Sequence, residues 1–283
     1  MLSPEWIPSV DLCHISPCLQ AIGRTRKLFG TFAVQEKKRK IEVDKMIEGY
    51  NDLHRDDQDH RNSSYTTLVN SYYELATLFY EWGWGQCFHF AFQLKGETFR
   101  ESITRHEYYL AGRLGVRKDD RVLDVGCGIG GPMRNIARFT RAKITGVTLN
   151  EYQVIRGNEL NAAAGLGDLA ESVQCDFMKL DKFPDNSFDG VYAIEATCHA
   201  PRREGVYGQI FRVLKPGQIF ACYEWCLTDK FDWKNPDHLL IKKKIEEGDG
   251  LPDMTTGAVC VEALKSVGFE VETPSQSIPS DHI

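Results

Sequence analysis

The sequence predicts an α/β fold with a mostly parallel, doubly wound sheet, preceded by separate helices. From residue 121 onward, segments with the pattern of strands alternate with segments with the pattern of helices. This alternation indicates βαβ units, which form parallel sheets. A glycine-rich turn at 126–131 joins the first strand to its helix. Ligands bind such sheets at the carboxyl ends of the strands, so the turn marks the expected binding region.

The individual elements follow from hydrophobic period and length. Apolar residues recur at helical spacing in 69–82 and 101–114, which predicts two amphipathic helices before the sheet. The expected strands are 121–125, 143–149, 172–177, 188–196, 218–225 and 269–273. The expected helices within this region are 132–140, 151–164, 205–214 and 256–266.

Composition excludes some classes of protein. The 283 residues carry a formal net charge of -6, which argues against a general nucleic-acid binder with its basic surface. No apolar stretch approaches the roughly 20 residues that a transmembrane helix needs, and the first residues lack the layout of a signal peptide. We therefore expect a cytoplasmic protein without a transmembrane segment.

The nine cysteines are odd in number and lie mostly in core-like segments. Cys127, Cys175, Cys198 and Cys222 fall on strands or strand ends, which is typical of reduced, buried thiols. Cys13 and Cys18 have no second ligand pair of the kind that a zinc site needs. We expect no metal.

The turn reads Asp124-Val125-Gly126-Cys127-Gly128-Ile129-Gly130-Gly131-Pro132. Glycines let the backbone turn sharply and approach a ligand closely, and the following helix directs its amide N–H groups to the same place. The spacing is G-x-G-x-G rather than the G-x-G-x-x-G of dinucleotide sites. Asp124 precedes the glycines, Asp176 follows the third strand and Glu195 lies in the fourth. The alternative is a Rossmann-like turn that binds no ligand.

These features resemble the Rossmann-like class I methyltransferase fold, which implies S-adenosylmethionine as cofactor. The resemblance implies that Asp124 binds the ammonium group of the cofactor's methionine. The acidic residue that usually ends the second strand is absent, because this strand runs into Thr148-Leu149-Asn150. Sterol and cyclopropane-type carbon methyltransferases lack it too, so Asn150 or Gln153 becomes the expected partner of the ribose. The expected cofactor-binding residues are Asp124, Gly126, Gly128, Gly130, Thr148, Asn150, Gln153, Asp176 and Phe177.

A second informative segment, Tyr80-Glu81-Trp82-Gly83-Trp84-Gly85-Gln86-Cys87-Phe88-His89-Phe90, is rich in aromatic residues. By composition it fits either core packing at a helix end or an apolar pocket with a few polar groups. It is similar to the aromatic signature of the sterol C24-methyltransferases, which lines their sterol pocket. The string from Tyr192 to Pro201 and the segments 223–229 and 248–252 resemble the same family, and the likeness extends over about 65–271.

The resemblance implies transfer of a methyl group from S-adenosylmethionine to C24 of a Δ24-sterol of the cycloartenol or zymosterol type, in sterol biosynthesis. Such a reaction needs ring faces that stabilise a cation and a base that removes a proton. The candidate bases are Glu195 and His199, then Glu81 and His89. The candidate substrate-binding residues are Tyr80, Trp82, Trp84, Phe88, Phe90, Tyr192 and Tyr223.

The resemblance also divides the chain. We expect an N-terminal, partly irregular extension at 1–64, a helical substrate-side region at 65–115, an S-adenosylmethionine-binding core at 116–275 and a truncated start of the family's C-terminal region at 276–283. The final antiparallel strand of the class I fold is expected to be missing, and the chain to be incomplete. Family members imply a homo-oligomer, associated peripherally with the endoplasmic reticulum. Two rival functions stay open: another small-molecule or lipid methyltransferase, and a non-catalytic binder of S-adenosylmethionine or sterol.

Overall fold

The computed structural model describes residues 47–52 and 64–272. The expected extension at 1–64 falls almost wholly outside these residues, as do Cys13, Cys18 and the segment 276–283. Among the described residues, no helix is both long enough and apolar enough to cross a membrane.

Five parallel strands form the sheet in the order β3-β2-β1-β4-β5. The strands are β1 (Arg121–Val125), β2 (Lys143–Thr148), β3 (Ala170–Gln174), β4 (Phe188–Ile194) and β5 (Leu214–Tyr223). The predicted parallel sheet is confirmed. The strand order reverses between β1 and β4, and a crevice at the carboxyl ends of the strands is expected at such a switch point.

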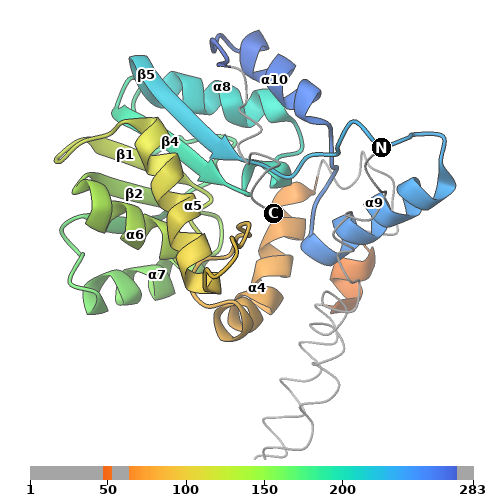
Figure 1. The fold of residues 1–283 in the computed structure, drawn as a ribbon, viewed down its shortest axis with the longest axis horizontal. Coiled ribbons are helices and arrows are strands. Elements are labelled where there is room, and N and C mark those ends of the chain that lie inside the picture. The colour runs from red at the N-terminus through yellow and green to blue at the C-terminus, as the bar shows by residue number, and fades with distance from the viewer. Residues whose placement is uncertain (1–46, 53–63, 273–283) are drawn as a thin grey trace, which may run out of the picture.

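Helices cover both faces of the sheet (Figure 1). On one face lie α5 (Phe99–Leu114) and α6 (Gly131–Thr140), and on the other lie α8 (Arg203–Val213) and α10 (Gly257–Ser266). Successive strand side chains point to opposite faces. Val122 therefore packs into the core under α5 and α6, whereas Leu123 packs into the core under α8.

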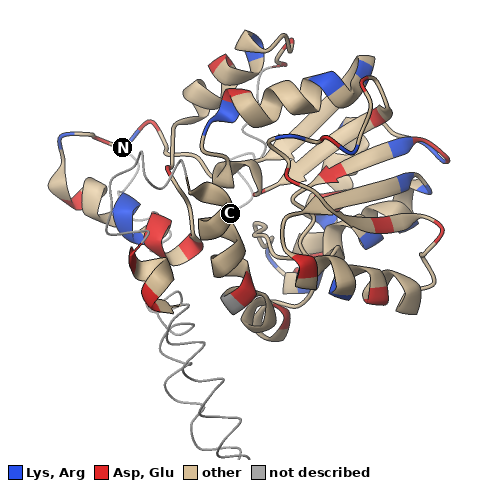
Figure 2. Cartoon of the chain, turned by 180° about the vertical axis from the view of Figure 1, so that it is seen from behind, with Lys and Arg blue, Asp and Glu red and all other residues tan. Residues whose placement is uncertain are grey.

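Two helices lie beyond the carboxyl ends of the strands, α4 (Tyr65–Gly83) and α9 (Pro236–Asp249) (Figure 1). Near them are the start of α7 (Glu151–Ala163), which connects β2 to β3, and the short 3-10 helix η2 (Thr197–His199). Lys and Arg positions are interspersed with Asp and Glu over the fold, and α4 itself carries two charged residues, Glu74 and Glu81 (Figure 2). The region where ligands bind such sheets is therefore bordered by a largely uncharged helix.

Most predicted elements are confirmed to within a few residues, and the differences have local causes. β3 ends at Gln174 rather than at 177, because the carbonyl oxygen of Asp176 accepts the amides of Lys179 and Leu180 and turns the chain. β5 begins directly after α8 at Leu214. α9 is not among the helices predicted from the sequence.

The strand expected at 269–273 is wrong for its described part. Residues 269–272 form no strand, and the amide of Phe269 donates to the carbonyl oxygen of Leu264 at the end of α10. The Phe269 ring packs against Phe211 and Phe220, with ring centroids 5.1 and 5.8 Å away. Helix capping and ring packing, rather than strand pairing, therefore fix the position of this segment.

The cysteines expected to be buried are free thiols in the structure. Cys127, Cys175 and Cys198 are buried, and Cys222 is partly buried.

Candidate active site

The glycine turn makes a tight backbone curve at the end of β1. The amides of Gly126 and Cys127 both donate to the carbonyl oxygen of Val147, at 2.9 and 3.0 Å. Gly126 has φ +82°, and a Cβ there would lie 2.3 Å from the Cβ of Ala196. Gly128 has φ +52°, and a Cβ there would lie 3.3 Å from the ring of Phe88. The turn therefore needs glycine both for its conformation and for its close packing.

A cavity of about 780 Å³, counted to include its opening to solvent, lies against this turn. The lining residues are Val69, Asn70 and Tyr73 of α4, then Gln86, Phe88, His89, Asp124, Gly126, Cys127, Gly128, Pro132, Thr148, Leu149, Asn150, Gln153, Phe177, Ile194, Glu195, Ala196 and His199.

Asp124 lies at the bottom of the pocket, at the end of β1. Its Oδ2 accepts a hydrogen bond of 2.8 Å from the Tyr192 hydroxyl. Burial raises the pKa of Asp124 to about 7, although the hydrogen bond from Tyr192 acts in the opposite direction. A cationic ligand group beside this carboxyl would favour its charged form. The site therefore fits an ammonium group.

The predicted ribose partners lie together at the start of α7 and are all buried. Thr148 donates from Oγ1 to Gln153 Oε1 at 2.6 Å, and Gln153 donates from Nε2 to Thr77 Oγ1 at 3.1 Å. Asn150 Oδ1 caps α7 by accepting the Gln153 amide at 3.0 Å, while its Nδ2 donates to Asn70 Oδ1 at 3.0 Å. The ends of these side chains therefore already contact α4, so a ribose here would lie beside that helix.

Two of the expected cofactor residues do not line the pocket. Gly130 is the N-cap of α6, with φ +75°. Asp176 accepts hydrogen bonds at Oδ1 from the Tyr65 hydroxyl and from the Met178 amide. Its neighbour Phe177 does line the pocket.

Glu195 follows β4 and faces the pocket with φ +52°, a conformation rare outside glycine. Its Oε1 accepts the Phe90 amide at 3.0 Å, and its Oε2 accepts the Trp225 Nε1–H at 2.9 Å. Burial raises the pKa of Glu195 to about 7, against the opposing effect of His89 and of these hydrogen bonds. This carboxyl therefore titrates near neutral pH inside the cavity.

His199, on η2, also lines the pocket. Its Nε2 lies 2.9 Å from the Tyr73 hydroxyl and its Nδ1 lies 3.2 Å from the carbonyl oxygen of Gly250. Burial lowers the pKa of His199 to about 4, so the imidazole is neutral at neutral pH.

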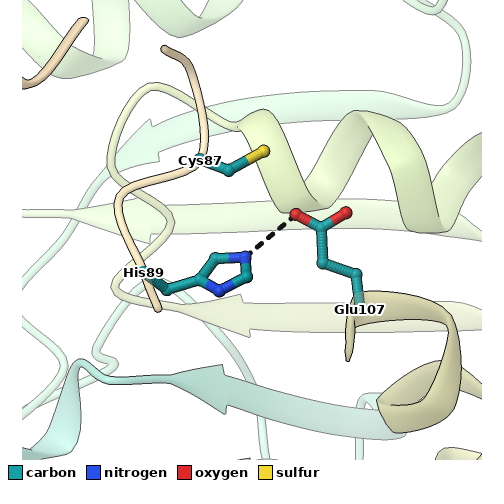
Figure 3. Close-up of side chains that lie close together, drawn as sticks. All are labelled: Cys87, His89 and Glu107. Carbon is teal, nitrogen blue, oxygen red and sulfur yellow. Dashed lines mark hydrogen bonds and ion pairs between the residues drawn. The ribbon is translucent and has the colours of Figure 1, made fainter. Parts of the chain in front are cut away.

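His89 is held by a buried contact with α5 (Figure 3). Its Nε2 lies 3.0 Å from Glu107 Oε1, and its Nδ1 lies 3.0 Å from the carbonyl oxygen of Phe90. Both neighbours are acceptors, so both ring nitrogens donate and the ring is an imidazolium. Burial lowers the pKa of His89, but the bonds to Glu107 and Phe90 outweigh it and raise the pKa above its usual value.

The expectation of no metal rested on cysteine spacing, and the structure adds a group that spacing does not reveal. Cys87, His89 and Glu107 place one ligand atom each within 4.8 Å of one another, a set that could hold a metal ion (Figure 3). In the structure, His89 and Glu107 bond to each other, and Asn135 Nδ2 donates to Glu107 at 2.7 Å.

The structure places Glu81 away from the other candidate bases. It forms an ion pair with Arg156 of α7, in which Arg156 Nη2 and Nε donate at 2.6 and 3.1 Å. It does not line the pocket.

The aromatic segment forms a chain of packed rings at the pocket, and only part of this chain lines the cavity. Tyr80 lies 5.2 Å from Phe88, Trp84 lies 5.1 Å from Phe90, and Phe90 lies 5.5 Å from Trp225 between ring centroids. Phe88 is the member of this chain that lines the pocket. Trp82, a candidate for substrate binding, is 88% exposed.

The other two substrate candidates also lie outside the lining. Tyr192 is buried in the sheet, where it bonds Asp124. Tyr223 stacks on His106 with ring centroids 3.6 Å apart.

Sequence reasoning missed the contribution of α4. Val69, Asn70 and Tyr73 line the pocket, and none of them is among the residues predicted for the site. The spacing of apolar residues over 69–82 predicts the helix, but it does not indicate that one side of this helix faces a ligand pocket.

The sheet order, the glycine turn and the pocket beside it define a class I S-adenosylmethionine-dependent methyltransferase fold. Residues 123–222 match a family described as "Methyltransferase domain". The solved structure of the [4+2]-cyclase SpnF is 27% identical with a TM-score of 0.61, and the likeness covers 71% of each chain. A geranyl diphosphate C-methyltransferase from Streptomyces coelicolor A3(2) shares the fold, with 20% identity, a TM-score of 0.54 and coverage of 59% of this chain and 62% of that one.

Curated relatives narrow the assignment. The chain is 58% identical over 224 residues to the cycloartenol-C-24-methyltransferase of Arabidopsis thaliana, covering 79% of this chain and 66% of the relative. It is 47% identical over 251 residues to the sterol 24-C-methyltransferase of Saccharomyces cerevisiae, covering 88% of this chain and 65% of the relative. The chain belongs to the sterol 24-C-methyltransferase family, and it spans slightly less than two thirds of the length of these relatives.

Proposed function

We propose that this protein transfers a methyl group from S-adenosylmethionine to C24 of a Δ24-sterol of the cycloartenol or zymosterol type. The observation that carries the proposal is the packing of the aromatic segment onto the glycine turn. Phe88 lies against Gly128, and the Phe90 amide donates to Glu195 at 3.0 Å. Residues associated with substrate and with cofactor therefore border one cavity.

The lining fits S-adenosylmethionine. Asp124 offers a buried carboxyl for the ammonium group, the glycine turn lets the backbone approach closely, and Asn150 and Gln153 stand where the ribose is expected. When bound, the cofactor supplies an electrophilic methyl group.

The methyl acceptor in this proposal is a carbon–carbon double bond, so attack requires no activated hydroxyl or thiol. Methylation leaves a cation near C25 of the sterol, a hydride shift follows, and loss of a proton gives a 24-methylene sterol. The Glu195 carboxylate and the Phe88 ring face the cavity and would stabilise positive charge there, since a water-poor site strengthens electrostatic interactions.

The proposed organisation keeps the N-terminal extension at 1–64, the substrate-side region at 65–115, the cofactor-binding core at 116–275 and the start of a further region at 276–283. We further propose that the protein forms a homo-oligomer that associates peripherally with the endoplasmic reticulum membrane.

A radiolabelled methyl-transfer assay tests the proposed activity. It uses cycloartenol and zymosterol as acceptors, with this chain and with a version extended at its carboxyl end by the corresponding segment of a relative. Labelled 24-methylene sterol from either protein supports the proposal. Folded protein that binds S-adenosylmethionine but labels neither sterol would contradict it, and labelling of phenolic or amine acceptors instead would favour a different methyltransferase.

A matched pair of glycine variants ties the activity to this pocket. Gly126→Ala should weaken S-adenosylmethionine binding by about 10-fold or more, because its Cβ would clash with Ala196 and its φ is positive. Gly167→Ala is the control, since its Cβ meets nothing within 4 Å. Isothermal titration calorimetry measures both affinities, and equal affinities would place the cofactor elsewhere.

A further inference from the structure

Tyr73 and His199 form a hydrogen-bonded pair in the wall of the pocket, although 126 positions separate them in the chain. The Gly250 carbonyl oxygen, 3.2 Å from His199 Nδ1, can only accept. His199 Nδ1 therefore carries the proton and Nε2 carries the lone pair. The Tyr73 hydroxyl, 2.9 Å from Nε2, must then be the donor.

This geometry decides which atom of the pair can accept a further proton. The only basic lone pair of neutral His199 is already occupied by the Tyr73 proton. The Tyr73 oxygen keeps acceptor capacity of its own, because a hydroxyl has two lone pairs and one proton. A proton that leaves a substrate in this cavity can therefore reach His199 by way of the Tyr73 oxygen.

We propose that Tyr73 is the group that removes the side-chain proton, with His199 as the final acceptor; this rests on the proposed sterol methylation. The C–H bond of the cationic sterol breaks, and its electron pair forms the new C=C bond. The released proton bonds to the Tyr73 oxygen while the original hydroxyl proton moves to His199 Nε2. The products are a neutral 24-methylene sterol, a neutral Tyr73 and a His199 imidazolium, so the charge is conserved.

The acid–base properties of the pair suit a concerted transfer. Burial raises the pKa of Tyr73 well above its usual value, so a phenolate does not form beforehand. Burial lowers the pKa of His199 to about 4, which keeps the ring unprotonated and available at neutral pH. A weak base is sufficient, because a C–H bond adjacent to a carbocation is strongly acidic.

Glu195 is placed for a different task. Each of its oxygens accepts one hydrogen bond, from Phe90 and from Trp225, and these bonds fix the orientation of the carboxyl. Its negative charge can lower the energy of the cation without taking the proton. The two roles separate into cation stabilisation by Glu195 and proton removal through Tyr73.

The test compares Tyr73→Phe with Tyr72→Phe in the methyl-transfer assay. Tyr72 is the neighbouring residue of α4, bonds Tyr80 at 2.8 Å between hydroxyl oxygens, and does not line the pocket. Tyr73→Phe should lower the rate of 24-methylene sterol formation by about 100-fold, at the low end of general-base effects. A larger fraction of the methylated product should carry a hydroxyl group at C24 or C25, because water captures the cation before it loses its proton. Tyr72→Phe should keep the product ratio of the unsubstituted enzyme.

Three results would overturn the inference. One is a Tyr73→Phe enzyme with an unchanged rate and product ratio. A second is the same product change in Glu195→Gln but not in Tyr73→Phe. The third comes from ¹⁵N-histidine NMR of the full chain, which needs no activity: we expect His199 protonated at Nδ1, with a shift of Nε2 on Tyr73→Phe, and an Nε2–H tautomer would contradict the pair. Absence of sterol methylation by the unsubstituted enzyme would instead remove the proposed function, and this inference with it.

Discussion

The contact between His89 and Glu107 shows how much a single buried pair can hold in place. The pair connects α5 to the segment that follows α4. In that segment Phe88 lines the pocket, and the Phe90 amide donates a hydrogen bond to Glu195. Neither side chain is exposed by more than 1%. Such a pair contributes little net stability when complete, but removal of one partner leaves a buried charge uncompensated.

We therefore expect Glu107→Gln to lower the free energy of unfolding by about 3 kcal/mol or more near pH 6. The pKa of folded His89 is raised, so the contribution of the pair is fully present below the unfolded pKa and is lost as the pH rises through the folded pKa. The difference in the free energy of unfolding between Glu107→Gln and the unsubstituted protein should therefore become smaller toward pH 9. Denaturant unfolding at several pH values measures it. Glu272→Gln is the control, since its ion pair with Arg113 is exposed, and a loss independent of pH would contradict the charged state of His89.

At the scale of elements, α4 organises the site. One helix contacts the exits of several strands: Tyr65 bonds Asp176, Asn70 bonds Asn150, Tyr73 bonds His199 and Thr77 bonds Gln153. Glu81 of α4 extends the contacts to Arg156 on α7. The cofactor-side residues and the candidate base are thus held by a single helix.

Asn150 has two separable roles at this junction, the N-cap of α7 and the contact with α4. Asn150→Ala should lower the free energy of unfolding by about 1 kcal/mol, because the first turn of α7 loses its cap. Asn150→Asp keeps the capping oxygen, and the Asn70 amide can rotate to donate, so its stability should stay close to that of the unsubstituted protein. Denaturant unfolding compares the variants. Equal losses in both would contradict the prediction, because they would show that a capping oxygen at this position does not stabilise the junction.

At the scale of the whole molecule, the described sheet ends on one side with β5, beyond which no further strand pairs among residues 64–272. Exposed strand edges are templates for pairing with other chains. Ile219 of β5 is 47% exposed and so adds apolar surface at this side.

Ile219→Lys should reduce concentration-dependent association, because a lysine at a sheet edge opposes pairing between chains. Ile155→Lys, at a similarly exposed position on α7, adds the same charge away from that edge and should change association less. Light scattering during size-exclusion chromatography, over a series of concentrations, measures the effect. An equal reduction in both variants would attribute it to net charge.

The sequence by itself determined the parallel sheet and the glycine turn, because strand alternation, helical period and glycine spacing are local signals. The expected β1 matches the structure at both ends, and α6 and β2 match within one residue. Asp124, Glu195 and His199 were predicted as site residues and do face the pocket. Of the predicted substrate-binding aromatic residues, Phe88 alone lines the pocket.

The tertiary structure decided which side chains meet. Tyr73 bonds His199, which is 126 positions away in the chain. Glu81 pairs with Arg156 and does not line the pocket. His89 bonds Glu107. None of these pairings has a local period, because each depends on where α4 and α5 pack over the ends of the strands. The sequence therefore indicated which residues can carry the chemistry. Whether each of them lines the cavity, forms an ion pair or lies at the surface depends on how distant elements pack.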